Sequence, residues 1–189
     1  MNNTEFLKNY VNGFSKLLEE SSKISISKLI DVSDTIKEAN NNGNKVLIFG
    51  NGGSSAIASH FSVDLTKNAG FRCVNFNEAD LLTCFSNDFG YERWVEKSID
   101  FYADEGDVII LISSSGNSQN MVNGITASRN KNVHKIITFT GFDNLNHLRK
   151  LGDINIWVDS KAYNYVENIH QFFLLSIVDL LIGNSEYSA

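Results

Sequence analysis

Five short apolar runs, separated by polar turns and helical patterns, constrain the fold of this 189-residue chain most strongly. Continuous apolar runs are typical of parallel strands that are buried on both faces of a sheet. Strands that alternate with helices indicate right-handed βαβ units. The sequence therefore predicts an α/β fold in three layers, doubly wound around a mostly parallel five-stranded sheet. The predicted strands are KVLIF, RCVNF, DVIILIS, KIITFT and INIWV, at residues 45–49, 72–76, 107–113, 135–140 and 154–158.

Two helical patterns precede the first strand. Apolar residues recur at helical spacing over residues 4–21 and again over residues 24–39, and the segment NNNGN then ends the second pattern. No repeat or low-complexity linker divides the chain. We therefore expect a single domain, with an N-terminal helical pair in residues 1–42, an α/β core in residues 43–182 and a tail in residues 183–189.

Charge and hydropathy exclude several classes of partner. The formal net charge is −6, so the chain carries no basic footprint for nucleic acid, and an anionic ligand would need local backbone donors. Residues 164–182 predict a strongly apolar last helix, but we expect no run to reach the roughly 18 apolar residues that span a bilayer. The N-terminal residues show no signal core, which favours a cytoplasmic location. Cys73 and Cys84 are too few for a disulfide scaffold and are expected to be free thiols.

Two similar turns follow the first and third predicted strands. They are GNGGSS at residues 50–55 (the first loop) and SSSGNS at residues 113–118 (the second loop), and each opens a helix. Ligands of open α/β sheets bind at the carboxyl ends of strands, and helix N-termini favour anions. Neither loop contains lysine, which excludes a nucleotide P-loop. Helix capping is the simpler explanation of one such turn, but two on neighbouring strands favour a phosphate site.

These motifs, together with SNDFG, TFTG and ENIHQFFLLSIVDLL, resemble the sugar isomerase (SIS) domain. The resemblance is greatest to the phosphoheptose isomerases, which interconvert sedoheptulose 7-phosphate and D-glycero-D-manno-heptose 7-phosphate. It extends to about Ile182 and implies the SIS fold, a sugar-phosphate ligand and a homotetramer whose helices pack across subunits. The positions that match the substrate contacts of the family are Asn51, Gly52, Gly53, Ser54, Asn87, Asp88, Ser113, Ser114, Ser115 and Ser118.

The resemblance also implies a zinc site beside the substrate. In the family, a His and a Glu on the first-loop helix join a Gln and a His on the last helix, and the Glu and the last His are the acid/base pair. This chain has His60 and Asp64 on the first of these helices and Glu167 and Leu175 on the last. The implied ligands are therefore His60, Asp64 and Glu167, whereas leucine can neither bind a metal nor transfer a proton. Asn164 also replaces a family aspartate.

His170 is a candidate replacement for the missing histidine. It follows Glu167 by three residues, so the two share a face of the predicted helix, as His60 and Asp64 do on theirs. These four residues could form a rebuilt metal site, and Asp64 and His170 are the candidate catalytic residues. The alternative is that His170 lines the site wall or a subunit interface. The expected function is an aldose–ketose isomerase of the phosphoheptose type; the alternative is a catalytically impaired module that binds phosphosugars or protein partners.

Overall fold

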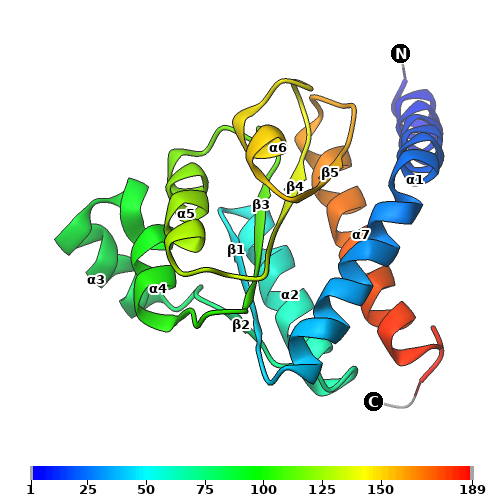
Figure 1. The fold of residues 1–189 in the computed structure, drawn as a ribbon. Coiled ribbons are helices and arrows are strands. Elements are labelled where there is room, and N and C mark those ends of the chain that lie inside the picture. The colour runs from blue at the N-terminus through cyan, green and yellow to red at the C-terminus, as the bar shows by residue number, and fades with distance from the viewer. Residues whose placement is uncertain (1, 188–189) are drawn as a thin grey trace.

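The computed structural model describes residues 2–187, so the first residue and the last two residues of the expected tail lie outside it. Its five strands form one sheet in the order β2-β1-β3-β4-β5, and all four pairings are parallel. The predicted doubly wound α/β fold is confirmed, and every predicted strand is present to within one residue at each end (Figure 1). The strands are β1 (Val46–Gly50), β2 (Cys73–Asn75), β3 (Val108–Ser113), β4 (Lys135–Thr140) and β5 (Ile154–Trp157).

Helices cover both faces of the sheet. Alternate strand residues point to opposite faces, so Ile48 joins one apolar core while Leu47 and Phe49 join the other. Figure 1 shows the two helical layers on either side of the strands. The first layer holds α1 (Asn3–Asn41), α2 (Gly53–Lys67) and α7 (Tyr163–Ile182). The second holds α3 (Ala79–Phe89), the short 3-10 helix η1 (Tyr91–Arg93), α4 (Trp94–Tyr102), α5 (Gln119–Asn130) and α6 (His147–Leu151).

The expected N-terminal helical pair is one continuous helix, so this part of the prediction is wrong. The junction between the two predicted helices contains neither Gly nor Pro, and the Ser22 hydroxyl donates to the carbonyl of Leu18 at 2.7 Å within the helix. Serine is tolerated inside a helix when it bonds the carbonyl four residues back. The second half of α1 packs into the core through Val32 and Ile36, whereas Phe6 in the first half is exposed.

Two helices were not predicted. α3 begins after a short polar segment, and Leu81, Leu82 and Phe85 on its inner side pack against the second core. Their spacing is helical, so the same periodicity used for the other helices would have found α3. α6 has only five residues, and the side chain of Asn146 caps it by accepting from the backbone of Arg149. A helix this short leaves too little periodicity for prediction.

One helix of the described residues, α7, is long and apolar enough to cross a bilayer, by length and composition only. The sequence had been expected to hold no such segment, and this expectation is wrong. A core helix passes the same test, and α7 packs against α1 and α2. Its inner side contributes Ile169, Phe173 and Ile177 to the first core. The opposite side, which includes Phe172, is exposed.

Candidate functional site

A cavity of about 210 Å³ opens at the carboxyl ends of β1 and β3. The order β2-β1-β3 reverses the direction in which the sheet is built between these two strands. A reversal of this kind is the usual ligand-binding position of open α/β sheets. The first and second loops therefore meet around one cavity, as their places in the sequence had predicted. The lining residues are Asn51, Ser54, Ile112, Ser113, Ser114, Ser115, Ser118, Tyr163 and Glu167.

The second loop is rich in hydroxyl groups that face one another. The Ser113 hydroxyl lies 3.0 Å from that of Ser118 and 3.5 Å from that of Ser115. Ser118 occupies the N-cap of α5 without capping it through its side chain. The hydroxyl of Ser114 is buried, and it has no hydrogen-bond partner within residues 2–187. A hydroxyl without a protein partner can bond to a ligand in the cavity that it lines.

The first loop opens α2 in a similar way. Gly52 is the N-cap of this helix, and no side chain caps it. The carboxyl group of Glu167 on α7 lies against Gly53, where an added Cβ would overlap it unless the Glu167 side chain moved. Burial raises the pKa of the Glu167 carboxyl above its usual value. The uncapped N-terminus of α2 and the Glu167 carboxyl therefore lie side by side at the cavity.

Asn87 and Asp88, expected among the substrate contacts, do not line the cavity, and the nearby Tyr91 contacts a lining residue instead. Asn87 and Asp88 are exposed at the end of α3, hydrogen-bond to each other at 2.9 Å, and are not among the lining residues. Tyr91 follows them, and its hydroxyl donates to the side-chain oxygen of Asn51 at 3.0 Å. Sequence reasoning missed Tyr91, because an isolated tyrosine after a turn carries no motif.

The predicted metal ligands are only partly brought together. His60 lies 3.2 Å from the Asp64 carboxylate, and its other ring nitrogen lies 3.1 Å from the amide of Gln171. Glu167 lies apart from them, beside Gly53. No group of three His, Cys, Asp or Glu side chains within residues 2–187 is placed to hold a metal ion. His, Asp and Glu suit zinc by type, but the expected three-ligand group is not formed.

The proposed replacement histidine lies in the core. His170 is fully buried, and its Nε2 lies 3.0 Å from the carbonyl oxygen of Thr140. Its ring packs edge-on against Phe139. Burial lowers the pKa of His170 to about 4, so its ring is neutral near pH 7. His170 is therefore not among the residues that line the cavity, and the four-residue metal site with His60, Asp64 and Glu167 is not assembled.

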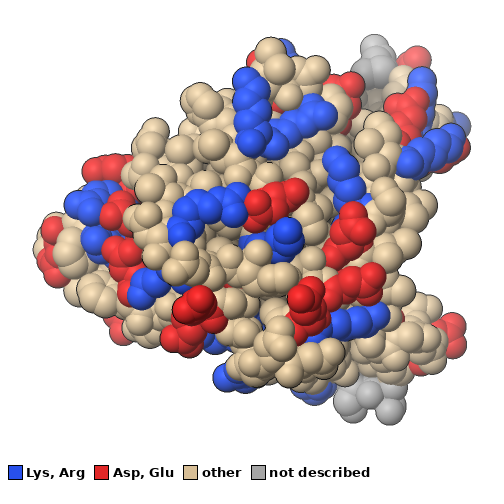
Figure 2. Space-filling model, in the orientation of Figure 1, with Lys and Arg blue, Asp and Glu red and all other residues tan. Residues whose placement is uncertain are grey.

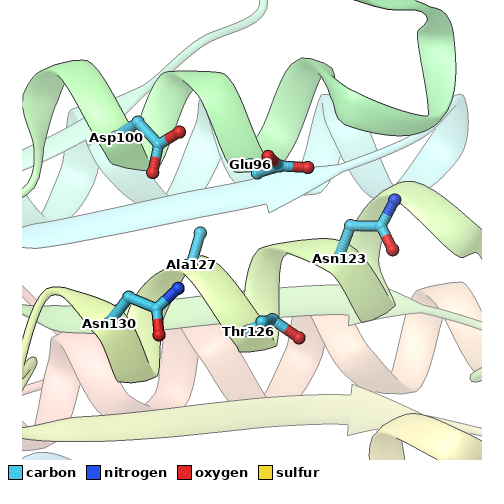
Figure 3. Close-up of a pocket in the computed structure, with 6 residues that line it drawn as sticks. All are labelled: Glu96, Asp100, Asn123, Thr126, Ala127 and Asn130. Carbon is cyan, nitrogen blue, oxygen red and sulfur yellow. The ribbon is translucent and has the colours of Figure 1, made fainter.

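A second cavity, of about 250 Å³, lies between α4 and α5 (Figure 3). Two carboxylates of α4, Glu96 and Asp100, face three polar side chains of α5 across it. Glu96 forms an ion pair with Arg93 at 2.5 Å, and Asp100 forms one with Lys97 at 2.8 Å. These contacts neutralise the carboxylates, so this cavity offers neither free charge nor a buried polar atom without a partner. The chemistry points instead to the cavity at β1 and β3.

Surface charge does not single out a basic patch on the face shown in Figure 2, where basic and acidic side chains are interspersed. With a formal net charge of −6, the chain carries no overall field that would attract an anion. Lys and Arg are also absent from the residues that line the cavity at β1 and β3. Anion binding there would rest on hydroxyl groups and backbone N–H groups.

Comparison with known proteins gives the class to which this fold and site belong. Residues 9–141 match the family model described as the SIS domain. The chain therefore belongs to the SIS domain family.

Its relatives within that family are named phosphoheptose isomerases. The probable phosphoheptose isomerase of Thermoplasma acidophilum is 33% identical over 166 residues, which cover 82% of this chain and 90% of the relative. The phosphoheptose isomerase of Aliarcobacter butzleri is 34% identical over 170 residues, which cover 87% of this chain and 83% of the relative. The solved structure of phosphoheptose isomerase GmhA from Neisseria gonorrhoeae shares the fold, with a TM-score of 0.89 and 24% identity. The match covers 96% of this chain and 100% of the GmhA chain.

Proposed function

We propose that this chain is a sugar-phosphate isomerase of the phosphoheptose isomerase type, which interconverts sedoheptulose 7-phosphate and D-glycero-D-manno-heptose 7-phosphate. The observation that carries the proposal is the serine-lined cavity at the ends of β1 and β3, where two uncapped helix N-termini meet. The names of the curated relatives support a phosphorylated sugar as the ligand.

The second loop is the proposed phosphate site. Ser113, Ser115 and Ser118 already lie within hydrogen-bond reach of one another, and each hydroxyl can turn its proton to a phosphate oxygen. Ser114 supplies a buried hydroxyl that lacks a partner among the described residues. The N-terminus of α5 adds backbone donors and the positive end of the helix dipole. The sugar would extend from this loop toward Asn51 and Glu167, which line the same cavity.

The reaction moves one proton between neighbouring carbons. A base removes the proton from the carbon beside the carbonyl, an enediol forms, and a proton returns to the adjacent carbon while the hydroxyl proton moves to the other oxygen. Glu167 is the carboxyl group that lines the cavity, whereas Asp64 and His170 do not line it. We therefore assign the proton transfer to Glu167. No step is assigned to zinc, because the expected ligands do not form one group.

The test is turnover of sedoheptulose 7-phosphate by the purified full chain, followed by NMR with and without added zinc. We expect formation of the aldose product, and we expect Glu167→Gln to reduce it about a hundredfold or more, the usual contribution of a general base. Glu105→Gln, at an exposed loop residue, is the matched control and should retain activity. Absence of turnover in both zinc conditions would reject the isomerase, and full activity of Glu167→Gln would reject the assigned base.

A binding module without catalysis is the second candidate function. The observation that favours it is that Leu175 occupies the place of the catalytic histidine of the family and His170 is buried among core residues. In this case the protein would bind sedoheptulose 7-phosphate in calorimetry and would show no turnover. Leu175→His is the informative variant: a gain of isomerase activity would mean that the natural chain has lost this chemistry.

We also propose that the protein works in the cytoplasm as a homotetramer. Several large apolar side chains of α1 and α7 are exposed, among them Ile24, Ile30 and Phe172. Between α1 and the end of β5 lies a largely apolar cavity of about 390 Å³ that includes Leu17 and Trp157. Surfaces of this kind are typical of subunit interfaces. The free thiols of Cys73 and Cys84 suit a reducing compartment.

A further inference from the structure

A reciprocal pair of hydrogen bonds with Asn120 holds the side-chain amide of Asn51 in place. Its nitrogen donates to the side-chain oxygen of Asn120 at 3.0 Å, and the nitrogen of Asn120 donates back at 3.1 Å. Asn120 lies in the first turn of α5 and is only 2% exposed. Asn51 follows β1 and lines the cavity. The pair therefore joins the first loop to the helix that follows β3.

Tyr91 completes the bonding of the Asn51 oxygen. This oxygen has two acceptor sites, and the Tyr91 hydroxyl at 3.0 Å fills the one that Asn120 leaves open. One N–H of the Asn51 amide is used by Asn120, so the second N–H is what Asn51 can offer to a ligand. With both acceptor sites filled, Asn51 presents a donor to the cavity, which suits a hydroxyl or carbonyl oxygen of a sugar and not a donor group.

Tyr91 is held in place by the backbone on either side of it, and the packing of its ring contributes little. Gly90 ends α3 with a φ of +91°, a conformation that glycine adopts readily, and turns the chain into η1. The amide of Asn123 on α5 donates to the carbonyl of Glu92 at 2.8 Å and anchors η1. The side chain of Tyr91 itself is 57% exposed. Its hydroxyl can therefore be removed without opening a space in the core.

We propose that Tyr91 is a positioning residue of the sugar subsite: its hydroxyl orients the Asn51 amide, which then donates to an oxygen on the sugar chain of the phosphorylated ligand. This inference rests on the proposed function, since it concerns the sugar part of the same ligand. It separates two parts of the cavity. The second loop binds the phosphate, and the Tyr91–Asn51–Asn120 group recognises oxygens of the sugar. Loss of the Tyr91 hydroxyl leaves the amide held by Asn120 alone, with one acceptor site of its oxygen open.

The test compares Tyr91→Phe with Tyr102→Phe, the same change at an exposed tyrosine of α4 whose ring lies against Phe76. Calorimetry measures the affinity of the full chain for sedoheptulose 7-phosphate and for inorganic phosphate. We expect Tyr91→Phe to weaken binding of the sugar phosphate about fivefold, the usual effect of one hydrogen bond. The affinity for inorganic phosphate should be unchanged, KM should rise, and kcat should stay within about twofold. The Tm should move by less than about 2 °C.

Each alternative outcome has a distinct meaning. Equal affinities of the wild type and Tyr91→Phe for the sugar phosphate would overturn the role of Tyr91 and leave the proposed function intact. A parallel loss of affinity for both ligands, with a lowered Tm, would also overturn it, because a general structural effect would explain the result. If the wild type binds inorganic phosphate but not sedoheptulose 7-phosphate, the proposed function fails and the sugar subsite with it.

Discussion

Gly116 shapes the second loop because both its backbone and its surroundings exclude a side chain. Its φ is +66°, in the left-handed region that other residues adopt only with strain. An added Cβ would overlap the side-chain amide of Asn146. Asn146 cannot move aside easily, because it is 2% exposed and its amide donates to the carbonyls of Gly141 and Asp143. The serines on either side of Gly116 owe their positions to this turn.

Gly116→Ala should therefore lower both the stability of the protein and its affinity for phosphate. We expect the free energy of unfolding to fall by about 1–2 kcal/mol from the left-handed backbone, and the Kd for inorganic phosphate to rise at least tenfold, because the loop must shift. Gly70→Ala is the control, since Gly70 has a φ of +77° and an added Cβ would meet no described atom within 4 Å. Urea unfolding and calorimetry measure both quantities. Equal phosphate affinity in the two variants would contradict this role of Gly116.

His170 makes stability depend on pH in a defined direction. The unfolded chain binds a proton at His170 near pH 6.5, whereas burial lowers the pKa in the folded protein to about 4. Because the folded state binds this proton less readily, stability falls as the pH drops from about 6.5 toward 4. Between pH 7 and pH 5 the loss from this residue is about 2 kcal/mol. Between pH 7 and pH 5, the free energy of unfolding of His170→Gln, measured with urea, should fall by about 2 kcal/mol less than that of the wild type. An unchanged slope in His170→Gln would reject the prediction.

Residue-level prediction succeeded where a motif marks a position and failed where packing decides. The serines of the second loop were placed at one strand end from sequence, and the structure gathers them around one cavity. Their contact with a ligand stays a prediction. The periodicity that put Glu167 and His170 on one helical face could not tell that Glu167 reaches the cavity while His170 enters the core. Tyr91 was not predicted because its partner, Asn51, is distant in sequence.

At the level of elements, one buried carboxylate ties the starts of β1 and β3 together. Asp107 accepts hydrogen bonds from the backbone N–H groups of Lys45 and Asp104, both at 2.9 Å, and it pairs with the ammonium group of Lys45 at 2.6 Å. Its side chain is 1% exposed. The contact lies at the amino ends of the strands, at the opposite edge of the sheet from the cavity. It should therefore act on stability and not on ligand binding.

Asp107→Ala should lower the free energy of unfolding by about 3 kcal/mol, because it leaves two partly buried backbone N–H groups without an acceptor and removes the buried carboxylate that pairs with the Lys45 ammonium group. The control is Asp104→Ala. Asp104 bonds the same ammonium group at 2.6 Å, but its side chain is 79% exposed, so its loss should lower stability far less. Urea unfolding compares the two variants, and calorimetry with inorganic phosphate should give the wild-type Kd for both. A similar loss of stability in the two variants would show that burial does not distinguish these carboxylates.

The elements that were predicted correctly are those whose local pattern agrees with their burial. β1 and β3 are nearly continuous apolar runs, and all of their residues are buried. The errors among the helices include those at α1 and α3. The break expected between residues 21 and 24 is absent, and the Ser22 hydroxyl bonds within the continuous helix. α3 was not predicted, although the spacing of Leu81 and Phe85 is helical.

At the scale of the whole molecule, the two longest helices carry the largest exposed apolar surface. α1 and α7 pack against each other, and both leave one side uncovered. α7 is also the helix that is long and apolar enough to pass as a membrane span, by length and composition only. A second copy of the chain would cover both helices without a bilayer. The exposed large apolar residues of these helices include Phe6, Leu7, Val11, Ile24, Ile26, Ile30, Phe172 and Leu180.

The proposed homotetramer predicts a mass in solution four times the 21.1 kDa of one chain, measured by light scattering coupled to size-exclusion chromatography without detergent. Phe172→Glu places a charge on the exposed side of α7, where the side chain is 51% exposed, and should shift the mass to smaller species because an interface does not tolerate an unpaired buried charge. Leu145→Glu is the control, since Leu145 is 64% exposed in the loop before α6 and lies on neither long helix. A wild-type mass of one chain, or a tetramer that persists in Phe172→Glu, would mean that this side of α7 is not an interface between copies.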